Sequence, residues 1–500
     1  MTKIHKYILN ILFLFITIIL LSPILISMNF PIELEVREST LWLHILTIKE
    51  GINIYDQNIV AYANQAHGPI DPLFKFIIHK ILFFLEPWQV SRLNNILFFF
   101  SIFLINYQIL NKKNDLKIIL FISVTIYSLI FLFTKTFQGR ADVTAMLLIS
   151  YLSFLCVDKN FYKNNVKLIL VSFLFSIIFM TNWRFLPLCL AISFFPIFCS
   201  DNLKDIFSKK KILILLKYFI FASIPLLLLL VIFFNFDIKK YFDYFIGFFY
   251  FESFFTYDHY LKGFYQLIRV EKIYFLIILT SIYLIKFYKK NDLIFHYVIK
   301  ILISLLVFLS CLISFLYNYV GGGIYYFTPV IFFLWYLILF EYKNNNLDFS
   351  LKNKINIYII LISIIIILSA TKNSVRSYFS LNSGYSDALE LHKYLKSLNS
   401  KSKSVLSESL HFHKEKYSGE KIDIGDLISY RAFQIGGKYE ETYLSHLNDI
   451  KNKKYKYIIH NFTGSKIIND LIKNGNYKII KKFKKNISNI GEILILERVN

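Results

Sequence analysis

The chain lacks the cysteine patterns of a zinc protein or of a disulfide-linked secreted domain. Only four of its 500 residues are cysteine, and no two of them have a Cys-x-x-Cys or Cys/His spacing. Each lies within or at the end of an apolar segment, where cysteine behaves as a small hydrophobic residue. The chain also lacks internal repeats of about 20 to 50 residues, the signature of solenoid proteins. Its glycine run, Gly321-Gly322-Gly323, lacks the Gly-Lys-Ser/Thr of a phosphate-binding loop.

Acidic residues are the second deficit. There are 33 Asp and Glu against 56 Lys and Arg, which gives a net charge of +23. Such a surplus can indicate a nucleic-acid partner, but here the basic residues cluster in short loops between apolar runs. That distribution is typical of the cytoplasmic loops of a membrane protein. We therefore predict no nucleic-acid partner.

Apolar residues, by contrast, are in excess. They make up 56% of the chain, and the mean hydropathy is +0.51, whereas a soluble domain has about 45–50% apolar residues. Several runs approach or exceed about 18 nearly uncharged residues, the length that crosses a bilayer as a helix. The clearest runs contain Ile8–Met28, Phe98–Leu110, Ile212–Phe234 and Ile357–Ala370. The fold class is therefore an α-helical polytopic membrane protein.

Basic loops predict the topology. Lys3 and Lys6 precede the first run, which lacks a small-residue cleavage site, so we expect an uncleaved first span at about 8–28. With the N-terminus in the cytoplasm, the positive-inside rule gives about eleven spans of the plasma membrane. Pro72–Leu85 is apolar but short and carries three basic residues. It suits a helix lying on the outer surface better than a span.

The composition changes abruptly after Ala370. Residues 371–500 are polar and Lys-rich, with short β-type runs and a helical pattern over Ser386–Leu398. We expect a transmembrane domain over 1–370, whose first outer loop with its juxtamembrane helices covers 29–91, and a small extracytoplasmic α/β domain over 371–500. The predicted strands are Ser404–Leu406, Tyr455–His460, Tyr477–Phe483 and Glu492–Glu497. His411 and His413 are expected to be solvated loop residues.

The first outer loop is the densest candidate site. It contains Glu33, Glu35, Arg37 and Glu38 directly after the first span. On a helix Glu35 and Glu38 share a face. Carboxylates at the membrane boundary are candidate general bases because a reduced dielectric raises their pKa. The alternative is that these acidic residues only solvate an outer loop.

The loop resembles the acidic motif of the GT-C superfamily of membrane glycosyltransferases, which includes protein O-mannosyltransferases and aminoarabinose transferases. That motif is an Asp-Glu pair after the first span, followed by Gly and an aromatic residue, a His-Pro element and a later Arg. The similar residues here are Glu38, Gly51, Tyr55, His67-Gly68-Pro69, Pro72-Leu73 and the Arg of Ser91–Asn95. Arg37 occupies the place of the family's Asp, so Glu35 is a second candidate for the catalytic carboxylate.

Three further arginines are candidate phosphate ligands, because the guanidinium group suits phosphate. Arg140 and Asp142 lie at the predicted outward start of a span, where the family often has an acidic residue. Arg184 lies between two apolar runs and Arg269 in an aromatic-rich loop. Each arginine has an alternative role as an anchor at the membrane interface.

The resemblance implies an inverting transfer of a sugar from a polyprenyl-phosphate donor to a hydroxyl acceptor on a glycan, lipid or protein. The catalytic candidates are Glu38, Glu35 and Asp142, and the substrate-binding candidates are Arg37, His67, Arg140, Arg184 and Arg269. No bound cofactor is required, although some relatives use a divalent metal. The alternatives are a transporter or lipid-linked sugar flippase, and an O-antigen ligase or polymerase. Transporters usually place their ionisable residues near the midplane, whereas here they gather at one predicted face.

Overall fold

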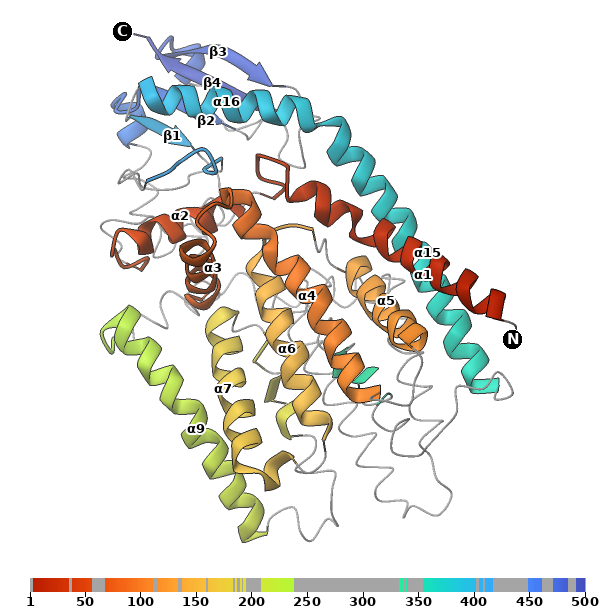
Figure 1. The fold of residues 1–500 in the computed structure, drawn as a ribbon. Coiled ribbons are helices and arrows are strands. Elements are labelled where there is room, and N and C mark those ends of the chain that lie inside the picture. The colour runs from red at the N-terminus through yellow and green to blue at the C-terminus, as the bar shows by residue number, and fades with distance from the viewer. Residues whose placement is uncertain are drawn as a thin grey trace, which may run out of the picture.

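The structure is a computed structural model in which a bundle of apolar helices carries a small sheet at one end (Figure 1). It describes residues 3–35, 38–55, 68–110, 116–133, 137–158, 161–182, 208–237, 354–401, 404–407, 410–416, 448–460, 471–483 and 492–499, with short pieces between 185 and 194 and between 332 and 339.

Apolar helices form the bundle. Their bounds are α1 Lys3–Ser27, α4 Pro87–Leu110, α5 Leu116–Phe133, α6 Ala141–Val157, α7 Asn165–Thr181, α9 Lys209–Phe234 and α15 Lys354–Ser383. Among the described residues three helices are long and apolar enough to cross a membrane: α4, α9 and the part of α15 from Ile360. Four shorter apolar helices accompany them. Most of residues 238–353, where further spans are predicted, lie outside the described residues.

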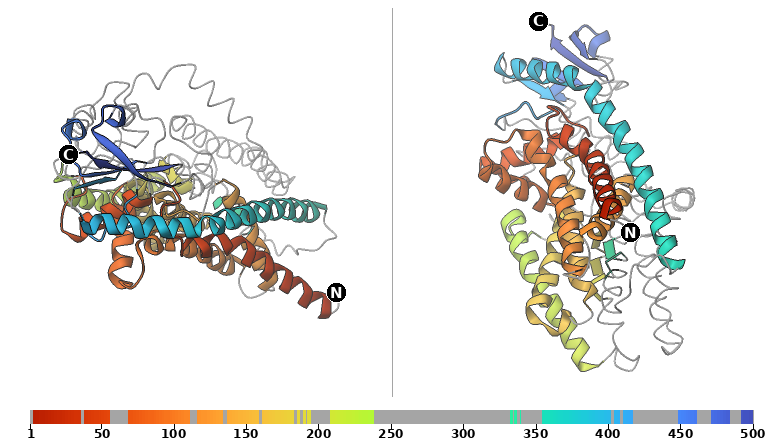
Figure 2. Two further views of the ribbon diagram at one scale, coloured as in Figure 1. Left: turned by 90° about the horizontal axis from the view of Figure 1, so that it is seen from above. Right: turned by 45° about the vertical axis from the view of Figure 1, so that its right-hand side comes forward.

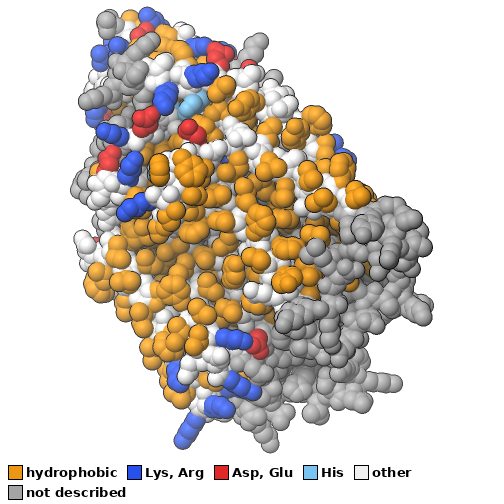
Figure 3. All heavy atoms as spheres, viewed as in Figure 1, with side chains coloured by type: hydrophobic (Ala, Val, Ile, Leu, Met, Phe, Trp, Pro, Cys, Tyr) orange, Lys and Arg blue, Asp and Glu red, His pale blue; other side chains and the backbone are white. Residues whose placement is uncertain are grey.

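The surface of the bundle is apolar in a broad belt (Figure 3). On α9, Leu213, Ile220 and Leu228 are each more than half exposed. Lysines and arginines appear at the two ends of the belt rather than across it. An exposed apolar area of this extent requires a non-aqueous environment, and the chain is therefore a membrane protein.

Neighbouring helices are joined by small polar side chains. Ser374 on α15 donates a hydrogen bond to the carbonyl oxygen of Ile19 on α1 (2.7 Å), and Asn106 on α4 donates to Ser123 on α5 (3.0 Å). In lipid, helices associate through such bonds and through close packing rather than through burial of apolar surface from water. α6 lies between α4 and α7, and α7 packs against α9.

Two short helices, α2 (Glu38–Lys49) and α3 (Ile70–Ile81), cover one end of the bundle (Figure 1). Twelve residues of α3 extend about 18 Å, well short of the roughly 30 Å of hydrocarbon. One side of α3 buries polar side chains, while Ile77 and Ile81 are exposed. This amphipathic character suits a helix at the interface, as predicted for this segment.

The C-terminal strands form a four-stranded sheet in the order β1-β2-β4-β3. β1 (Val405–Ser407) is parallel to β2 (Tyr457–His460), and β4 (Ile493–Arg498) is antiparallel to both β2 and β3 (Tyr477–Phe483). All four lie on the predicted strand runs, displaced by one or two residues at most.

The sheet is covered by α16 (Tyr385–Lys401), which follows α15 after a single residue. Its buried face consists of Ala388, Leu391, Leu395 and Leu398, the face that the sequence predicts. Figure 2 shows α15 running along the side of the bundle and leading into α16. The predicted boundary at 370/371 thus falls inside a continuous helix, because the change in composition marks where α15 becomes polar rather than where it ends.

Candidate functional site

Turns that are distant in sequence converge at the end of the bundle that carries α2 and α3. The amide hydrogen of Gly68 bonds to the carbonyl oxygen of Thr181 at the end of α7 (2.8 Å). Asn53 donates to the carbonyl oxygen of Phe233 at the end of α9 (2.8 Å). The loop after α2, the start of α3 and the ends of α7 and α9 therefore share one end of the molecule.

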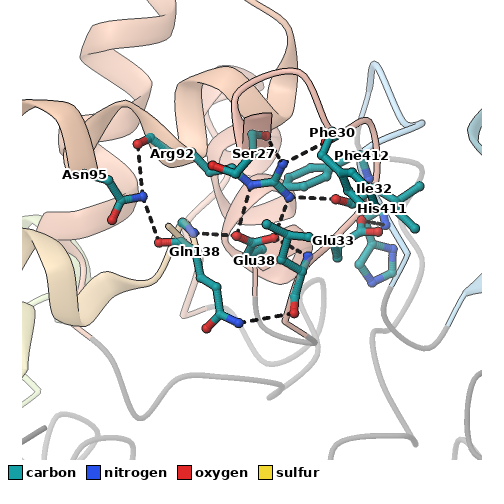
Figure 4. A network of polar contacts seen from close by, with 12 residues as sticks. Ser27, Phe30, Ile32, Glu33, Glu38, Arg92, Asn95, Gln138, His411 and Phe412 are labelled. Atoms are coloured by element: carbon teal, nitrogen blue, oxygen red, sulfur yellow. Dashed lines mark hydrogen bonds and ion pairs between the residues drawn. The ribbon is translucent and has the colours of Figure 1, made fainter. Parts of the chain in front are cut away.

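Glu38 and Arg92 form the centre of a buried polar network (Figure 4). Both side chains are fully buried, and Arg92 binds both carboxylate oxygens of Glu38, with Nε–Oε1 and Nη2–Oε2 distances of 3.2 and 2.8 Å. Glu38 also accepts hydrogen bonds from the amides of Leu34 (2.6 Å) and Gly139. A buried carboxylate with this many donors is held in one position.

Arg92 also binds the loop that follows α1. Its Nη1 donates to the carbonyl oxygens of Ser27 (2.5 Å) and Phe30 (2.7 Å). Its Nη2 donates to the carbonyl oxygen of Ile32 (2.6 Å). One guanidinium therefore fixes the exit of the first helix, the loop after it and the carboxylate of α2, which only the planar five-donor group of arginine can do.

The turn before α6 belongs to the same network. Asn95 donates to the carbonyl oxygen of Gln138, and Gln138 donates to that of Leu34 (3.1 and 3.3 Å). A Cβ added to Gly139 would lie 2.6 Å from the carbonyl oxygen of Ser91 on α4. Only glycine allows the turn to approach α4 this closely. This approach brings the Gly139 amide to Glu38.

Asp142 lies in the first turn of α6, where the helix dipole favours a negative charge. Its Oδ1 accepts a hydrogen bond from Asn182 (2.8 Å), and its Oδ2 is 3.0 Å from Nη2 of Arg140. The Arg140 side chain is 22% exposed and that of Asp142 3%. This ion pair combines a fixed carboxylate with a guanidinium that reaches the surface.

A second buried ion pair, Asp71 and Lys75, lies beside Gly139. Lys75 on α3 contacts Asp71 (2.9 Å) and the carbonyl oxygen of Gly139 (2.9 Å), and both side chains are fully buried. Asp71 also accepts a hydrogen bond from Thr144 on α6. The sequence did not predict this pair as a site, although the i,i+4 spacing of an acid and a base within an apolar helix is a visible signal.

Glu33, in the loop after α1, is a further buried carboxylate and was not among the predicted catalytic or substrate-binding residues. It is 1% exposed, and its Oε1 accepts hydrogen bonds from the amides of His411 (2.8 Å) and Phe412 (3.0 Å). Burial raises the pKa of Glu33 from 4.5 to about 7, although its backbone hydrogen bonds oppose the shift. No local signal distinguishes Glu33 from Glu35, since its partners lie almost 380 residues away.

The prediction that His411 and His413 are solvated is wrong. Their side chains are 1% and 4% exposed. Burial holds the pKa of each well below its usual range, with a smaller contribution from Lys414. The reason is that the turn that carries them packs against the first loop instead of projecting into water.

The other predicted site residues divide into two groups. Glu35 is partly exposed one turn before Glu38, and its carbonyl oxygen accepts the Glu38 amide hydrogen (3.0 Å). Four predicted substrate-binding residues lie outside the described residues: Arg37, His67, Arg184 and Arg269. Among the residues that are described, no group of three or more His, Cys, Asp or Glu side chains could hold a metal ion.

The chain matches none of the protein-family models and none of the curated proteins with which it was compared. Its structure is similar to the crystal structure of ArnT from Cupriavidus metallidurans bound to undecaprenyl phosphate, with a TM-score of 0.55 over 97% of each chain and 9% sequence identity. At this identity the likeness concerns the fold. The chain therefore has the GT-C-like membrane fold to which its sequence motifs point.

Proposed function

We propose that the chain is a glycosyltransferase that moves a sugar from a polyprenyl-phosphate donor to a hydroxyl acceptor at the outer face of the plasma membrane. The observation that carries the proposal is the Arg140–Asp142 pair at the end of the bundle, next to the buried Glu38–Arg92 network. The fold supports it, since the similar ArnT structure was obtained with undecaprenyl phosphate bound.

Asp142 is the best-placed of the three predicted catalytic carboxylates. Glu38 is saturated by Arg92 and two amides and would have to break these bonds to accept a proton. Asp142 is held by a hydrogen bond from Asn182 and by an ion pair with Arg140. The Arg140 guanidinium is partly exposed, so it can also bind the phosphate of the donor. In this assignment Glu38 positions the turn, while Glu35 remains a second candidate base.

The reaction follows from these roles. The acceptor hydroxyl oxygen attacks the anomeric carbon from the side opposite the phosphate, and Asp142 takes the hydroxyl proton. The bond between the anomeric carbon and the phosphate oxygen breaks, and the polyprenyl phosphate leaves with the electron pair. Arg140 stabilises the charge that develops on that oxygen. The configuration at the anomeric carbon is inverted, and no bound cofactor is required.

Binding and transfer can be tested separately in the purified full-length protein. Arg140→Ala is expected to weaken the binding of undecaprenyl phosphate, measured by native mass spectrometry, by about tenfold or more, the effect of losing a charge-assisted hydrogen bond. Asp142→Asn is expected to keep this binding and to lower transfer of radiolabelled sugar from its polyprenyl-phosphate carrier by about 100-fold or more. Arg376→Ala, an exposed position on α15, is the matched control.

Two outcomes would overturn the proposal. One is normal transfer by the Asp142→Asn variant together with normal binding by the Arg140→Ala variant. The other is an unchanged profile of surface glycans in cells without the protein, accompanied by altered uptake of a solute, which would indicate a transporter.

A further inference from the structure

The turn His411–Lys414, which follows β1, lies against the first loop (Figure 4). Three independent contacts hold it there. Glu33 accepts both amide hydrogen bonds described above, and Trp42 on α2 donates its indole N–H to the carbonyl oxygen of Lys414 (3.0 Å). The Phe412 ring lies 5.7 Å from the guanidinium carbon of Arg92.

Apolar packing completes this junction. Phe412 belongs to a buried cluster with Trp42, Leu43, Ile45, Leu46 and Trp88, which come from α2 and the start of α4. The Phe412 and Trp88 ring centroids are 6.4 Å apart. A segment of the C-terminal part is thereby a component of the core beneath the loop.

The loop from Asn29 to Leu34 is consequently held from two sides. On one side Arg92 binds the carbonyl oxygens of Phe30 and Ile32. On the other side Glu33 binds the turn. The same Arg92 fixes Glu38, and Glu38 binds Gly139, three residues before Asp142. A displacement of the loop would therefore be transmitted to the proposed base through consecutive hydrogen bonds.

Burying the Glu33 carboxylate costs desolvation free energy, and purely apolar packing between the loop and the turn would not carry this cost. Unlike apolar packing, hydrogen bonds are directional. One carboxylate oxygen accepts hydrogen bonds from two consecutive amides, and these bonds fix both the position and the orientation of the turn.

We propose that Glu33 is a positioning residue, which fastens the His411–Lys414 turn over the first loop and thereby holds the Glu38–Arg92 network in the geometry that transfer requires. The C-terminal part is then a structural component of the candidate site rather than a separate appendage. The inference rests on the proposed glycosyltransferase function, but the attachment itself can be measured without any activity.

The test combines hydrogen–deuterium exchange with kinetics in the full-length protein in detergent. Glu33→Ala removes both acceptors, and exchange at the amides of residues 411 and 412 is expected to rise by about tenfold, the effect of a lost hydrogen bond. In the transfer assay kcat is expected to fall by a similar factor, with little change in KM for the polyprenyl donor. Glu33→Gln, which keeps an acceptor oxygen, should restore most of both.

Two further variants complete the design. Trp42→Phe removes the indole hydrogen bond to Lys414 together with part of the ring's packing. It is expected to raise exchange and lower kcat less than Glu33→Ala does, and it serves as the second variant if Glu33→Ala does not fold. Glu390→Ala, whose carboxylate forms an exposed ion pair with Lys481 on the sheet, should change neither exchange nor kcat.

The outcomes separate the two proposals. If the wild-type protein transfers sugar and the Glu33→Ala variant has normal exchange and normal kcat, the positioning role is wrong. It is also wrong if Glu33→Gln is as damaging as Glu33→Ala, since the charge rather than the hydrogen bonds would then matter. If the wild-type protein transfers no sugar, the proposed function fails, while the exchange measurement still decides whether Glu33 fastens the turn.

Discussion

Arg92 shows how a single buried side chain can organise several segments. It neutralises Glu38 and occupies three carbonyl oxygens at the end of α1 and in the loop after it. Phe30 and Ile32 lie beyond the last residue of α1, and the Ser27 carbonyl oxygen also accepts the amide hydrogen of Phe30 (3.0 Å). Arg92 therefore both neutralises a buried carboxylate and binds the backbone where α1 ends, and we expect the loss of either Arg92 or Glu38 alone to destabilise the protein.

Arg92→Met is expected to lower the free energy of unfolding by about 3–5 kcal/mol, the usual effect of leaving one buried charge without its partner. Arg92→Lys should be only partly tolerated, since an ammonium group cannot reach both carboxylate oxygens and the carbonyls. The loss of monodisperse protein on heating, followed by size-exclusion chromatography in detergent, measures the effect. Arg376→Met, at an exposed site on α15, is the control, and equal stability of both variants would contradict the role given to Arg92.

Glu33 predicts a pH dependence of stability. Its pKa is about 7 in the folded protein against 4.5 for the free side chain, so between these values the folded state binds the proton that the unfolded chain has lost. The free energy of unfolding therefore decreases as the pH rises from 4.5 to about 7, by about 3 kcal/mol from this group. The charged and titratable neighbours are Glu38 and Arg92 on the loop side and His411, His413 and Lys414 on the turn.

Glu33→Gln removes this titration. Relative to the wild type, the variant should gain stability from pH 5 to about 7 and show a constant difference above pH 7. Denaturation in detergent at several pH values measures the difference. Stability curves that run parallel over the whole range would show that Glu33 does not titrate there.

At the scale of elements, the turn before α6 depends on Gly139. A methyl group there would collide with the Ser91 carbonyl of α4, so Gly139→Ala should push the turn away from Glu38. We expect a loss of stability of about 1–3 kcal/mol and a loss of transfer activity. Gly475→Ala is the matched control. It should also be destabilising, because Gly475 has φ +69°, but Gly475 lies in the turn before β3 and its replacement should leave activity unchanged.

The attachment of α3 to α6 depends on Asp71 and Lys75. Asp71→Leu or Lys75→Met alone should each destabilise the protein by about 3–5 kcal/mol, because the remaining charge is buried without its partner. The double variant should recover much of that loss. A double-mutant cycle of thermal stability in detergent tests this, and additive losses would contradict a coupled pair.

Local patterns predicted the elements well and the site only in part. Hydropathy and the 3.6-residue period are local properties, so α3, the buried face of α16 and the four strands could be found from the sequence. The sequence motif identified Arg92 as similar to the family's arginine. It did not reveal that Arg92 forms an ion pair with Glu38, which lies 54 residues earlier in the chain. The link between Glu33 and His411 spans 378 positions. Such pairs depend on tertiary packing, for which a single sequence has no periodic signal.

At the scale of the whole molecule, the topology decides on which side of the membrane the proposed chemistry occurs. The site end of the bundle carries α2, α3 and the sheet, while the N-terminal ends of α7 and α9 lie at the opposite end (Figure 1). The short helix Phe161–Lys163 precedes α7, and α9 begins at Lys209. Retention of lysines in the cytoplasm predicts that this opposite end is cytoplasmic. Asp142 and Arg140 would then lie at the outer face of the plasma membrane, where the proposed transfer to a surface acceptor takes place.

Single cysteines test this orientation. In a background with the four native cysteines replaced by alanine, Lys454→Cys, at an exposed position just before β2, should react with a membrane-impermeant maleimide in intact cells or spheroplasts. Lys163→Cys, exposed at the other end, should react only after lysis. Both lysines are exposed, so the protein should retain its fold in each variant. The reverse labelling pattern would place Asp142 and Arg140 in the cytoplasm, where an acceptor on the cell surface could not reach them.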